Sequence, residues 1–282
     1  MDEQLPTVAL LYDFDNTLCT KDMQEYGFIP SLDISAQEFW SQSNGLAKEE
    51  KMDRILACMY QMVRQSQAKR LSIRRETFVG LGEAVDFFPG VEQWFDRINA
   101  YALSCGMRAE HFIISSGLKE IIEGCPLAGA FKEIYACEFH YNENGVADWP
   151  KNVVNYTAKT QFLFRINKGV LDISDDEGLN EYRDNEDRPV PFRNMLYFGD
   201  GMTDVPCMKL VKLNGGKSIA VYKKRQKYKA AGLLKDNRVD FIAPADYTPG
   251  SELDILVKDI ICKVAADDKL AQLTRRQKKN CG

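Results

Sequence analysis

Short apolar runs that each end in polar residues recur along this chain, and longer stretches with apolar residues at helical spacing separate them. The first run covers residues 8–12 and stops at two carboxylates, Asp13 and Asp15. A bounded apolar run of this length predicts a strand that is covered on both faces. Ligands of open α/β sheets bind outside the carboxyl ends of the strands, so we expect both acids to point into a crevice. Two like charges this close favour metal binding combined with acid–base chemistry, although Asp is also common in turns.

A second apolar run, residues 111–114, ends at Ser115 and Ser116 and is followed by residues with a helical pattern. This order predicts a strand, a turn and a helix. Backbone N–H groups at the start of a helix, with a serine hydroxyl beside them, bind anions such as phosphate. A serine in this place also serves as an ordinary helix cap, so the pattern alone leaves both interpretations open.

A third run, residues 195–198, leads into the segment G-D-G-M-T-D. Its glycines permit a tight turn, which places Asp200 at the end of the strand and Asp204 about one helical turn further on. Further strands are expected at residues 134–136, 218–222 and 241–243, a hairpin turn at 144–145, and helices at 158–166 and 252–266. Strands that alternate with helices predict an α/β fold with a mostly parallel sheet.

The pattern between the first two runs is helical throughout. Apolar residues recur at helical spacing over residues 48–70, where a methionine-rich stripe is interpreted as core packing rather than substrate contact. A second helix is expected at residues 75–88, before the break at Pro89 and Gly90. We therefore predict a helical cap at residues 19–88, inserted into an α/β core formed by residues 1–18 and 89–282.

The composition, with 45% hydrophobic and 28% charged residues in a chain of 282, is typical of a globular protein and excludes disorder or a coiled coil. The formal charge of −4 gives nucleic-acid binding little electrostatic support. Basic residues near the end of the chain are interpreted as a solvated, fraying terminus rather than a binding patch: Arg275, Arg276, Lys278 and Lys279. No nucleic-acid partner is expected.

The chain begins Met-Asp-Glu, which is acidic where a secretory signal is basic, and its first apolar run is too short for a signal or a membrane span. We therefore expect a cytoplasmic protein without a membrane partner.

The eight cysteines include no C-x-x-C pair, which favours reduced thiols over a disulfide framework or a zinc site. Only two histidines are present, His111 and His140, so carboxylates are expected to carry the chemistry. The acidic residues 172–187 lack the spacing of a calcium loop and predict a solvated surface loop.

Three strand ends, D-F-D-N-T-L, I-I-S-S-G and G-D-G-M-T-D in this order, resemble the signature of the haloacid dehalogenase superfamily. The resemblance extends over residues 8–243, and the helical insertion is similar to the cap of the phosphoserine phosphatase-like branch. It implies a Rossmann-like core with a mobile helical cap. It also implies magnesium-dependent hydrolysis of a small-molecule phosphomonoester through an aspartyl-phosphate.

The resemblance assigns a role to each acid at the strand ends. Asp13 is the nucleophile, and Asp15 is the acid that protonates the leaving oxygen and then the base that activates water. Asp13, Asp200 and the backbone carbonyl of Asp15 hold Mg²⁺, and Asp204 is a further ligand or a support for one.

The remaining implied roles concern phosphate and substrate binding. Ser115 and the amide of Ser116 hold phosphate oxygens, and a lysine balances the charge that spreads over them. Lys159 is the expected lysine because it opens the helical stretch before the third acidic strand, whereas Lys168 lies at the end of that stretch. Asp22 lies where phosphoserine phosphatases carry a cap glutamate that contacts the substrate, and it has a solvated hinge residue as its alternative interpretation.

Three alternatives remain beside the phosphatase. Dehalogenases lack an acid two residues after the nucleophile because a halide leaves without a proton, so Asp15 favours phosphate chemistry. A phosphotransferase uses the same residues with an alcohol in place of water. A non-catalytic binding or regulatory module would keep the fold but has no need of Asp15. The sequence does not indicate the physiological substrate or the oligomeric state.

Overall fold

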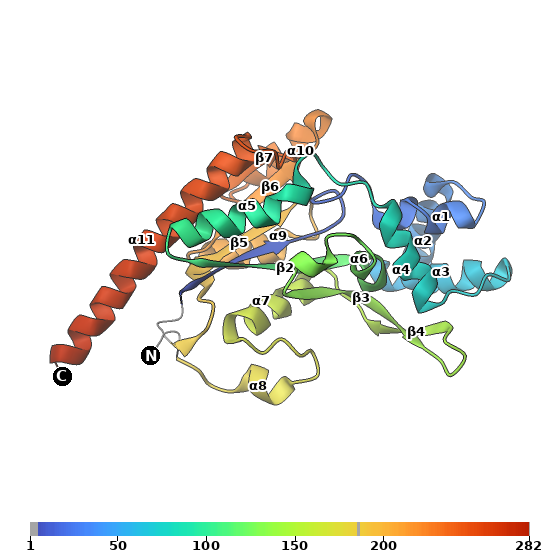
Figure 1. Cartoon of the computed structure of the whole chain (residues 1–282). Helices are drawn as coiled ribbons and strands as arrows, with labels where there is room; N and C mark the ends of the chain where they lie inside the picture. Colours follow the sequence, from blue (N-terminus) through green and yellow to red (C-terminus); the bar gives the residue numbers. More distant parts are fainter. Residues whose placement is uncertain (1–4, 185–186, 282) are drawn as a thin grey trace.

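A seven-stranded sheet forms the centre of the computed structural model, which describes residues 5–184 and 187–281. The strands follow the spatial order β4-β3-β2-β1-β5-β6-β7 (Figure 1). All neighbours are parallel except β3 and β4, which form an antiparallel pair. The strands are β1 (Thr7–Tyr12), β2 (Arg108–Leu118), β3 (Glu133–Tyr141), β4 (Ala147–Asn152), β5 (Met195–Gly199), β6 (Lys217–Tyr222) and β7 (Phe241–Pro244). The predicted α/β fold with a mostly parallel sheet is confirmed.

The first strand occupies the middle of this sheet. Every residue of β1 is buried, as its uninterrupted apolar run predicts for a strand covered on both faces. β1 pairs with β2 on one side and β5 on the other, with Tyr12 opposite both Ile113 and Phe198. The three strands that end in polar residues are therefore adjacent. Because they are parallel, their carboxyl ends meet at one edge of the sheet.

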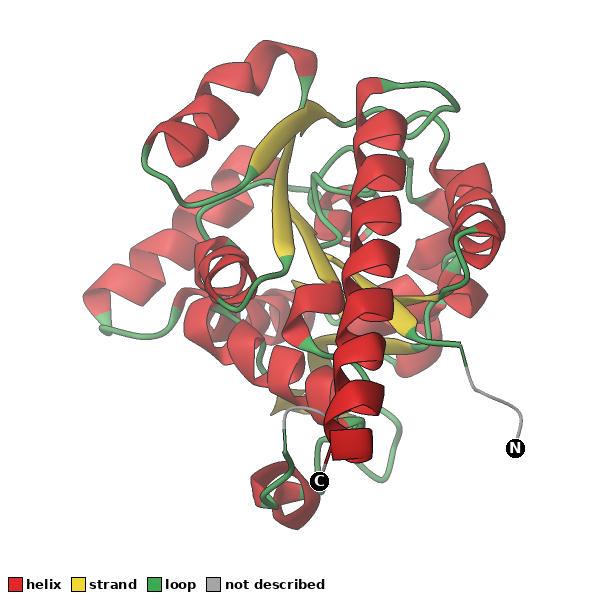
Figure 2. Ribbon diagram, turned by 90° about the vertical axis from the view of Figure 1, so that its left-hand side faces the viewer, coloured by secondary structure: helices red, strands yellow, loops and turns green. Residues whose placement is uncertain are grey.

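Helices cover both faces of the sheet. On one face α5 (Val91–Ser104) packs against β2, and α11 (Glu252–Cys281) runs beside α5 and β7 (Figure 1). On the other, α9 (Val205–Leu213) packs against β5, β6 and α7 (Lys159–Lys168). The remaining core helices are α6 (Lys119–Glu123), α8 (Asp176–Asn180) and α10 (Lys227–Lys235). Figure 2 shows the sheet between these layers, with α11 crossing in front of it.

A group of helices lies between β1 and α5 in the chain and beyond the carboxyl ends of the strands in space (Figure 1). It consists of α1 (Phe28–Ser31), α2 (Ala36–Glu49), α3 (Arg54–Ala68) and α4 (Arg75–Leu81). These helices form the cap that was expected after the first strand. The exact boundary at residues 19–88 stays a prediction.

The cap contains one break that the sequence pattern did not indicate. The expected helix over residues 48–70 is divided, because α2 ends at Glu49 and α3 begins at Arg54. Asp53 caps α3 by accepting hydrogen bonds from the backbone N–H groups of Ile55 and Leu56. The expected helix over residues 75–88 is also shorter, because α4 is followed by a single 3₁₀ turn.

Three other expectations need correction. β2 continues through Leu118, with an irregular register after Ile114, so that α6 begins only at Lys119. The acidic loop contains a short helix, α8, whose first turn is capped by Asp175; residues 185–186 lie outside the described residues. The basic end of the chain is exposed at Arg276 and Lys278, as expected, but it is helical rather than frayed: it forms the last part of α11. Side-chain contacts four residues apart, such as Gln272 with Asp268, support this helix.

Candidate active site

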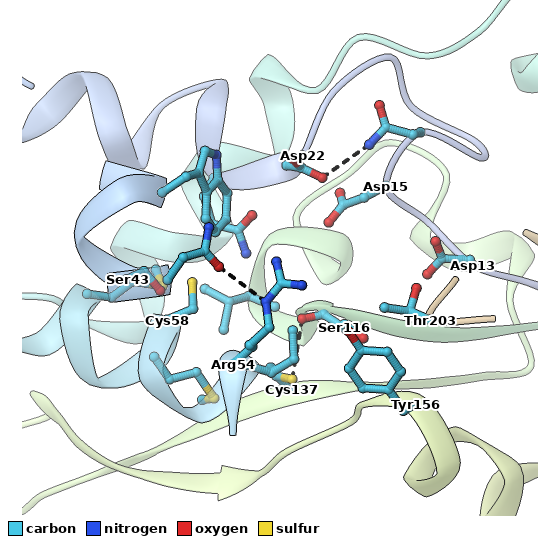
Figure 3. A pocket seen from close by; sticks show the side chains of 18 of the residues that line it. Asp13, Asp15, Asp22, Ser43, Arg54, Cys58, Ser116, Cys137, Tyr156 and Thr203 are labelled. Carbon is cyan, nitrogen blue, oxygen red and sulfur yellow. Dashed lines mark hydrogen bonds between the residues drawn. The ribbon is translucent and has the colours of Figure 1, made fainter. Parts of the chain in front are cut away.

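A cavity of about 370 Å³ lies between the carboxyl ends of the central strands and the cap (Figure 3). Five of the residues predicted from the sequence line it: Asp13, Asp15, Asp22, Ser116 and Asp200. They come from the ends of β1, β2 and β5 and from the first turn of the cap. The strand-end pattern therefore located a real concave surface, which is the usual form of a small-molecule site.

Lys159 binds Asp13 directly. Its Nζ atom lies 2.9 Å from Asp13 Oδ1 and 2.7 Å from Asp204 Oδ1, and all three side chains are buried. Burial alone would lower the pKa of Lys159, but the two carboxylates outweigh that effect and raise it above the ordinary value. Lys159 is therefore a fixed positive charge beside Asp13.

Asp204 is held from two further sides. Its Oδ1 atom also accepts a hydrogen bond of 2.9 Å from the Tyr197 hydroxyl. Its side chain packs directly on Gly199, where an added Cβ atom would lie only 2.5 Å from the Asp204 carboxyl carbon. Asp204 is completely buried. These contacts fit the supporting role of Asp204 that the family pattern allows, because they fix the lysine that binds Asp13.

The acidic side chains at this edge are close enough to share one cation. Single carboxylate oxygens of Asp13, Asp200 and Asp204 all lie within 4.8 Å of one another. Burial, with repulsion from Asp204, raises the pKa of Asp13 to about 7, and burial with repulsion from Asp13 and Asp204 raises the pKa of Asp200. A hard divalent cation would relieve this repulsion and takes oxygen ligands, so the residues fit a metal ion.

Asp15 faces the same cavity from the loop after β1. Its Oδ1 atom accepts a hydrogen bond of 2.9 Å from the backbone N–H of Met23, the residue that opens the first turn of the cap. Burial, with repulsion from Asp22 and Asp13, raises the pKa of Asp15 well above its usual range. A carboxyl group in such surroundings can retain a proton at neutral pH, as a general acid must.

The two serines differ in position. Ser116 lines the cavity, and its hydroxyl is buried without a hydrogen-bond partner among the described residues. Ser115 is completely buried, and its hydroxyl accepts a hydrogen bond of 3.0 Å from the backbone N–H of Gly117. A buried hydroxyl without a partner is costly, so Ser116 is the serine whose side chain is available to a ligand here.

Asp22, directly before the first turn of the cap, is held in place by a series of polar contacts. Asn16 Nδ2 donates to Asp22 Oδ1 at 3.1 Å, and Lys223 Nζ donates to Asn16 Oδ1 at 2.7 Å and to the carbonyl of Thr20 at 2.5 Å. Asn16 adopts a left-handed backbone conformation (φ 58°), which Asn tolerates better than most residues. Burial, with repulsion from Glu25, raises the pKa of Asp22.

Residues 10–209 match the family model of the haloacid dehalogenase-like hydrolases, which is more than half of the chain. The chain belongs to this family. The three predicted motifs that carried the resemblance, at the ends of β1, β2 and β5, all lie within or next to the cavity of this hydrolase.

The chain is also similar to one curated protein and to several solved structures. An uncharacterised protein of Borreliella burgdorferi is 29% identical over 93% of this chain and 99% of its own length. Among solved structures, a hydrolase of the same family from Salmonella enterica serovar Typhi superposes with a TM-score of 0.54 at 18% identity, covering 80% of this chain and 67% of that one. A phospho-aspartyl intermediate analogue of phosphoserine phosphatase superposes with a TM-score of 0.53 at 15% identity, covering 90% and 98%. The hydrolase thus shares the phosphoserine phosphatase fold.

The cap side of the cavity contains functional candidates that sequence reasoning missed. Arg54, Cys58 and Met62 all line it from one face of α3, at positions i, i+4 and i+8. The guanidinium of Arg54 points into the cavity toward the side of Asp15 and Asp22, and its Nε atom donates to Asn44 at 3.2 Å (Figure 3). The sequence signal that could have identified Arg54 is its position in helical register with the apolar stripe of α3. The methionine-rich stripe is core packing, as expected, but it also reaches the cavity, because Met62 is both buried and part of the cavity wall.

Lys168, the other lysine considered for the motif, points elsewhere. Its Nζ atom binds the backbone carbonyls of Leu179 at 2.5 Å and Glu181 at 2.7 Å, on the α8 side of the hydrolase. Within residues 5–184 and 187–281, no helix is both long enough and apolar enough to span a membrane.

Proposed function

We propose that this hydrolase is a magnesium-dependent phosphatase that cleaves small-molecule phosphomonoesters through an aspartyl-phosphate on Asp13. The observation that carries the proposal is the buried contact of Lys159 with Asp13 at a cavity that Asp15 and Asp200 also line. A nucleophile, a proton carrier, a fixed cation and a set of metal-binding oxygens are the groups that this reaction needs.

Asp13 performs the first displacement. One of its carboxylate oxygens attacks phosphorus in line with the leaving oxygen, so that a phosphorus–oxygen bond to Asp13 forms as the ester bond breaks. Lys159 holds the Asp13 carboxylate in place, and its charge favours the negative charge that accumulates on the phosphoryl oxygens. The Ser116 hydroxyl, which has no other partner in the described structure, donates to one of those oxygens.

Asp15 transfers the protons of both steps. It gives its proton to the leaving oxygen in the first step, and in the second it takes a proton from the water that attacks phosphorus and frees Asp13. The backbone N–H of Met23 holds Asp15 Oδ1 and leaves the other oxygen for this exchange. Because Met23 begins the first turn of the cap, movement of the cap and the orientation of Asp15 are linked.

Asp13, Asp200 and the carbonyl of Asp15 would hold Mg²⁺, with Asp204 as their support. The ion supplies positive charge that neutralises the phosphate group and the clustered carboxylates. When the ion is removed, the same carboxylates repel one another and destabilise the fold. Metal binding can therefore be measured as a rise in Tm, without an activity assay.

The cap, which we place at residues 19–88, limits the substrate to a small molecule. Asp22 and Arg54 present opposite charges to the part of the cavity beyond the phosphate position (Figure 3). A phosphomonoester that bears an amine or hydroxyl for Asp22 and an anionic group for Arg54 would satisfy both. The cavity of about 370 Å³ does not admit a folded phosphoprotein surface without opening of the cap.

The test is a panel of small phosphomonoesters assayed for phosphate release by the full chain, with Mg²⁺ and with a chelator. We expect magnesium-dependent release that is greatest for esters carrying both an amine and a carboxylate. Asp13→Asn is the control for a contaminating phosphatase. Release that continues unchanged in the chelator contradicts the metal-dependent mechanism, and transfer to an added alcohol in place of phosphate release identifies a phosphotransferase.

A further inference from the structure

Two thiols meet on the surface where α5 and α11 pack together. The sulfur atoms of Cys105, which ends α5, and Cys262, in the middle of α11, lie 3.5 Å apart although 157 positions separate them in the chain. The Tyr101 hydroxyl lies 3.0 Å from the Cys262 sulfur. Cys105 is half-buried and Cys262 is exposed, so that reagents in solution can reach the pair.

The other cysteines that the structure describes are in a different situation. All five are buried. Burial raises the pKa of four of them to about 12: Cys58, Cys125, Cys137 and Cys207. Burial also raises the pKa of Cys19, beside Asp15. Because the thiolate is the reactive form and these thiols are closed off from solvent, they are inert at neutral pH. Burial and the contact with Cys262 also raise the pKa of Cys105, so exposure rather than pKa distinguishes the pair.

We propose that Cys105 and Cys262 are a redox-active pair that forms a disulfide by exchange with a low-molecular-weight disulfide. The cysteine pattern, which favoured reduced thiols throughout, did not distinguish this pair from the buried ones because the two residues meet only in the folded chain.

The exchange proceeds in two balanced steps. The Cys262 thiolate attacks one sulfur of the small disulfide, which forms a mixed disulfide and releases one small thiolate. Cys105 then loses its proton and attacks the Cys262 sulfur, which forms the internal disulfide and releases the second small thiolate. Two protein thiols are oxidised by two electrons, and one small disulfide is reduced to two thiols.

Little movement is needed to complete the bond. A disulfide requires the sulfurs to approach from the observed 3.5 Å to about 2.05 Å, a change of about 1.5 Å. Cys105 is in the last turn of α5, where its backbone N–H binds the carbonyls of Tyr101 and Ala102, and Cys262 lies inside a regular helix. Both backbones are thus already held in place before oxidation.

The bond would attach α11 to α5 without closing the active site. Cys105 lies just before β2 begins, at the amino ends of the strands, whereas Asp13 follows the carboxyl end of β1. A cross-link between such distant residues restricts the unfolded chain strongly, so the oxidised protein should be more resistant to heat. The proposal does not depend on the proposed phosphatase activity.

The test is incubation of the full chain with oxidised glutathione, alkylation of the remaining thiols, and mapping of peptides without reduction. We expect the Cys105–Cys262 peptide pair to accumulate at least about tenfold faster than any other linkage. In Cys105→Ser, glutathione should stay attached to Cys262 because the resolving thiol is absent. Oxidation should raise Tm by about 5 °C in the wild type and leave Cys105→Ser unchanged.

Cys281→Ser is the matched control, since it removes a cysteine of the same helix and should behave as the wild type. Three outcomes overturn the proposal. Glutathione that stays on Cys262 in the wild type shows that Cys105 cannot reach it. Linkage of either cysteine mainly to Cys281 assigns the reactivity to the end of the helix, and complete resistance to oxidised glutathione shows that the pair is inert.

Discussion

Lys159 Nζ lies 2.9 Å from Asp13 Oδ1, and both side chains are buried. The two residues are 146 positions apart in the chain. The contact joins the amino end of α7 to the carboxyl end of β1. It also gives the proposed nucleophile, Asp13, a permanent neighbouring cation. Removing either partner leaves a charge buried without compensation, which is more costly than the absence of the whole pair.

Replacing Lys159 by methionine should therefore affect both activity and stability. We expect turnover to fall by about a hundredfold or more, because the transition-state charge loses its fixed partner. We also expect the free energy of unfolding to fall by about 3 kcal/mol, since Asp13 and Asp204 then repel each other without a cation. Phosphate release and denaturant unfolding measure the two effects.

Lys168→Met is the matched control, because Lys168 binds only the carbonyls of the α8 region among its contacts described above. It should keep turnover within about twofold of the wild type. Loss of activity in Lys168→Met with little loss in Lys159→Met would transfer the motif role to Lys168.

Asp200→Asn tests the metal site without relying on turnover. Folding raises the pKa of Asp200, so its ionisation opposes folding, and this cost appears as the pH rises from the ordinary carboxyl range toward the raised value. In a chelator at slightly alkaline pH the variant should accordingly have a higher Tm than the wild type. Added Mg²⁺ should raise Tm of the wild type but hardly that of the variant. A variant that gains as much from Mg²⁺ as the wild type would remove Asp200 from the site.

Asp22→Ala tests substrate selection by the cap. For the best small phosphomonoester we expect KM to rise about tenfold with little change in kcat, because one charged contact to the non-reacting part of the substrate is lost. For an aryl phosphate, which has no group for Asp22, KM should hardly change. Equal effects on both substrates would identify Asp22 as a hinge residue. Asn16→Ala is the companion variant, since Asn16 orients Asp22 and should shift KM in the same direction by less.

His111 predicts a pH dependence of stability that is separate from the active site. Its two ring nitrogens contact the Tyr12 hydroxyl at 3.1 Å and Asn99 Oδ1 at 3.0 Å, and burial lowers its pKa from 6.5 to about 3. Below about pH 6.5 His111 therefore binds a proton in the unfolded chain but not in the folded chain, so stability falls as the pH falls. Between about pH 7 and about pH 5 this lowers the free energy of unfolding by about 2 kcal/mol.

The comparison with His111→Gln isolates that contribution, because the other buried groups are common to both proteins. Denaturant unfolding at the two pH values should show a loss on acidification that is about 2 kcal/mol larger in the wild type than in the variant. His140→Gln, at an exposed histidine, is the control and should follow the wild type. A loss of equal size in His111→Gln would assign the pH dependence to other groups.

The fold could be predicted from the sequence because the signals were local. Uninterrupted apolar runs identified β1, β2 and β5, and a parallel sheet places the ends of such strands at one edge, which brought Asp13 and Asp200 to the same cavity. The antiparallel β4 followed from the turn at Gly145, whose positive φ of 70° suits a hairpin.

The rest depended on contacts between distant segments. The helical register of Arg54 with the apolar stripe of α3 is visible in the sequence, but which face of α3 covers the cavity follows from how the helix packs. Which of the two serines faces the cavity depends on the irregular register of β2 after Ile114. The pairing of Cys105 with Cys262 requires α11 to lie along α5. Each of these is a tertiary contact rather than a sequence period.

The central claim is that Asp13 accepts a phosphoryl group with the help of a metal ion, and beryllofluoride tests it without knowledge of the substrate. This anion binds a carboxylate oxygen in the geometry of an acyl phosphate. We predict that Mg²⁺ and beryllofluoride together raise Tm of the wild-type protein by several degrees beyond Mg²⁺ alone, and that Asp13→Asn, with its fold intact by circular dichroism, shows no such additional rise. No additional rise in the wild type, or an equal one in Asp13→Asn, would contradict the account.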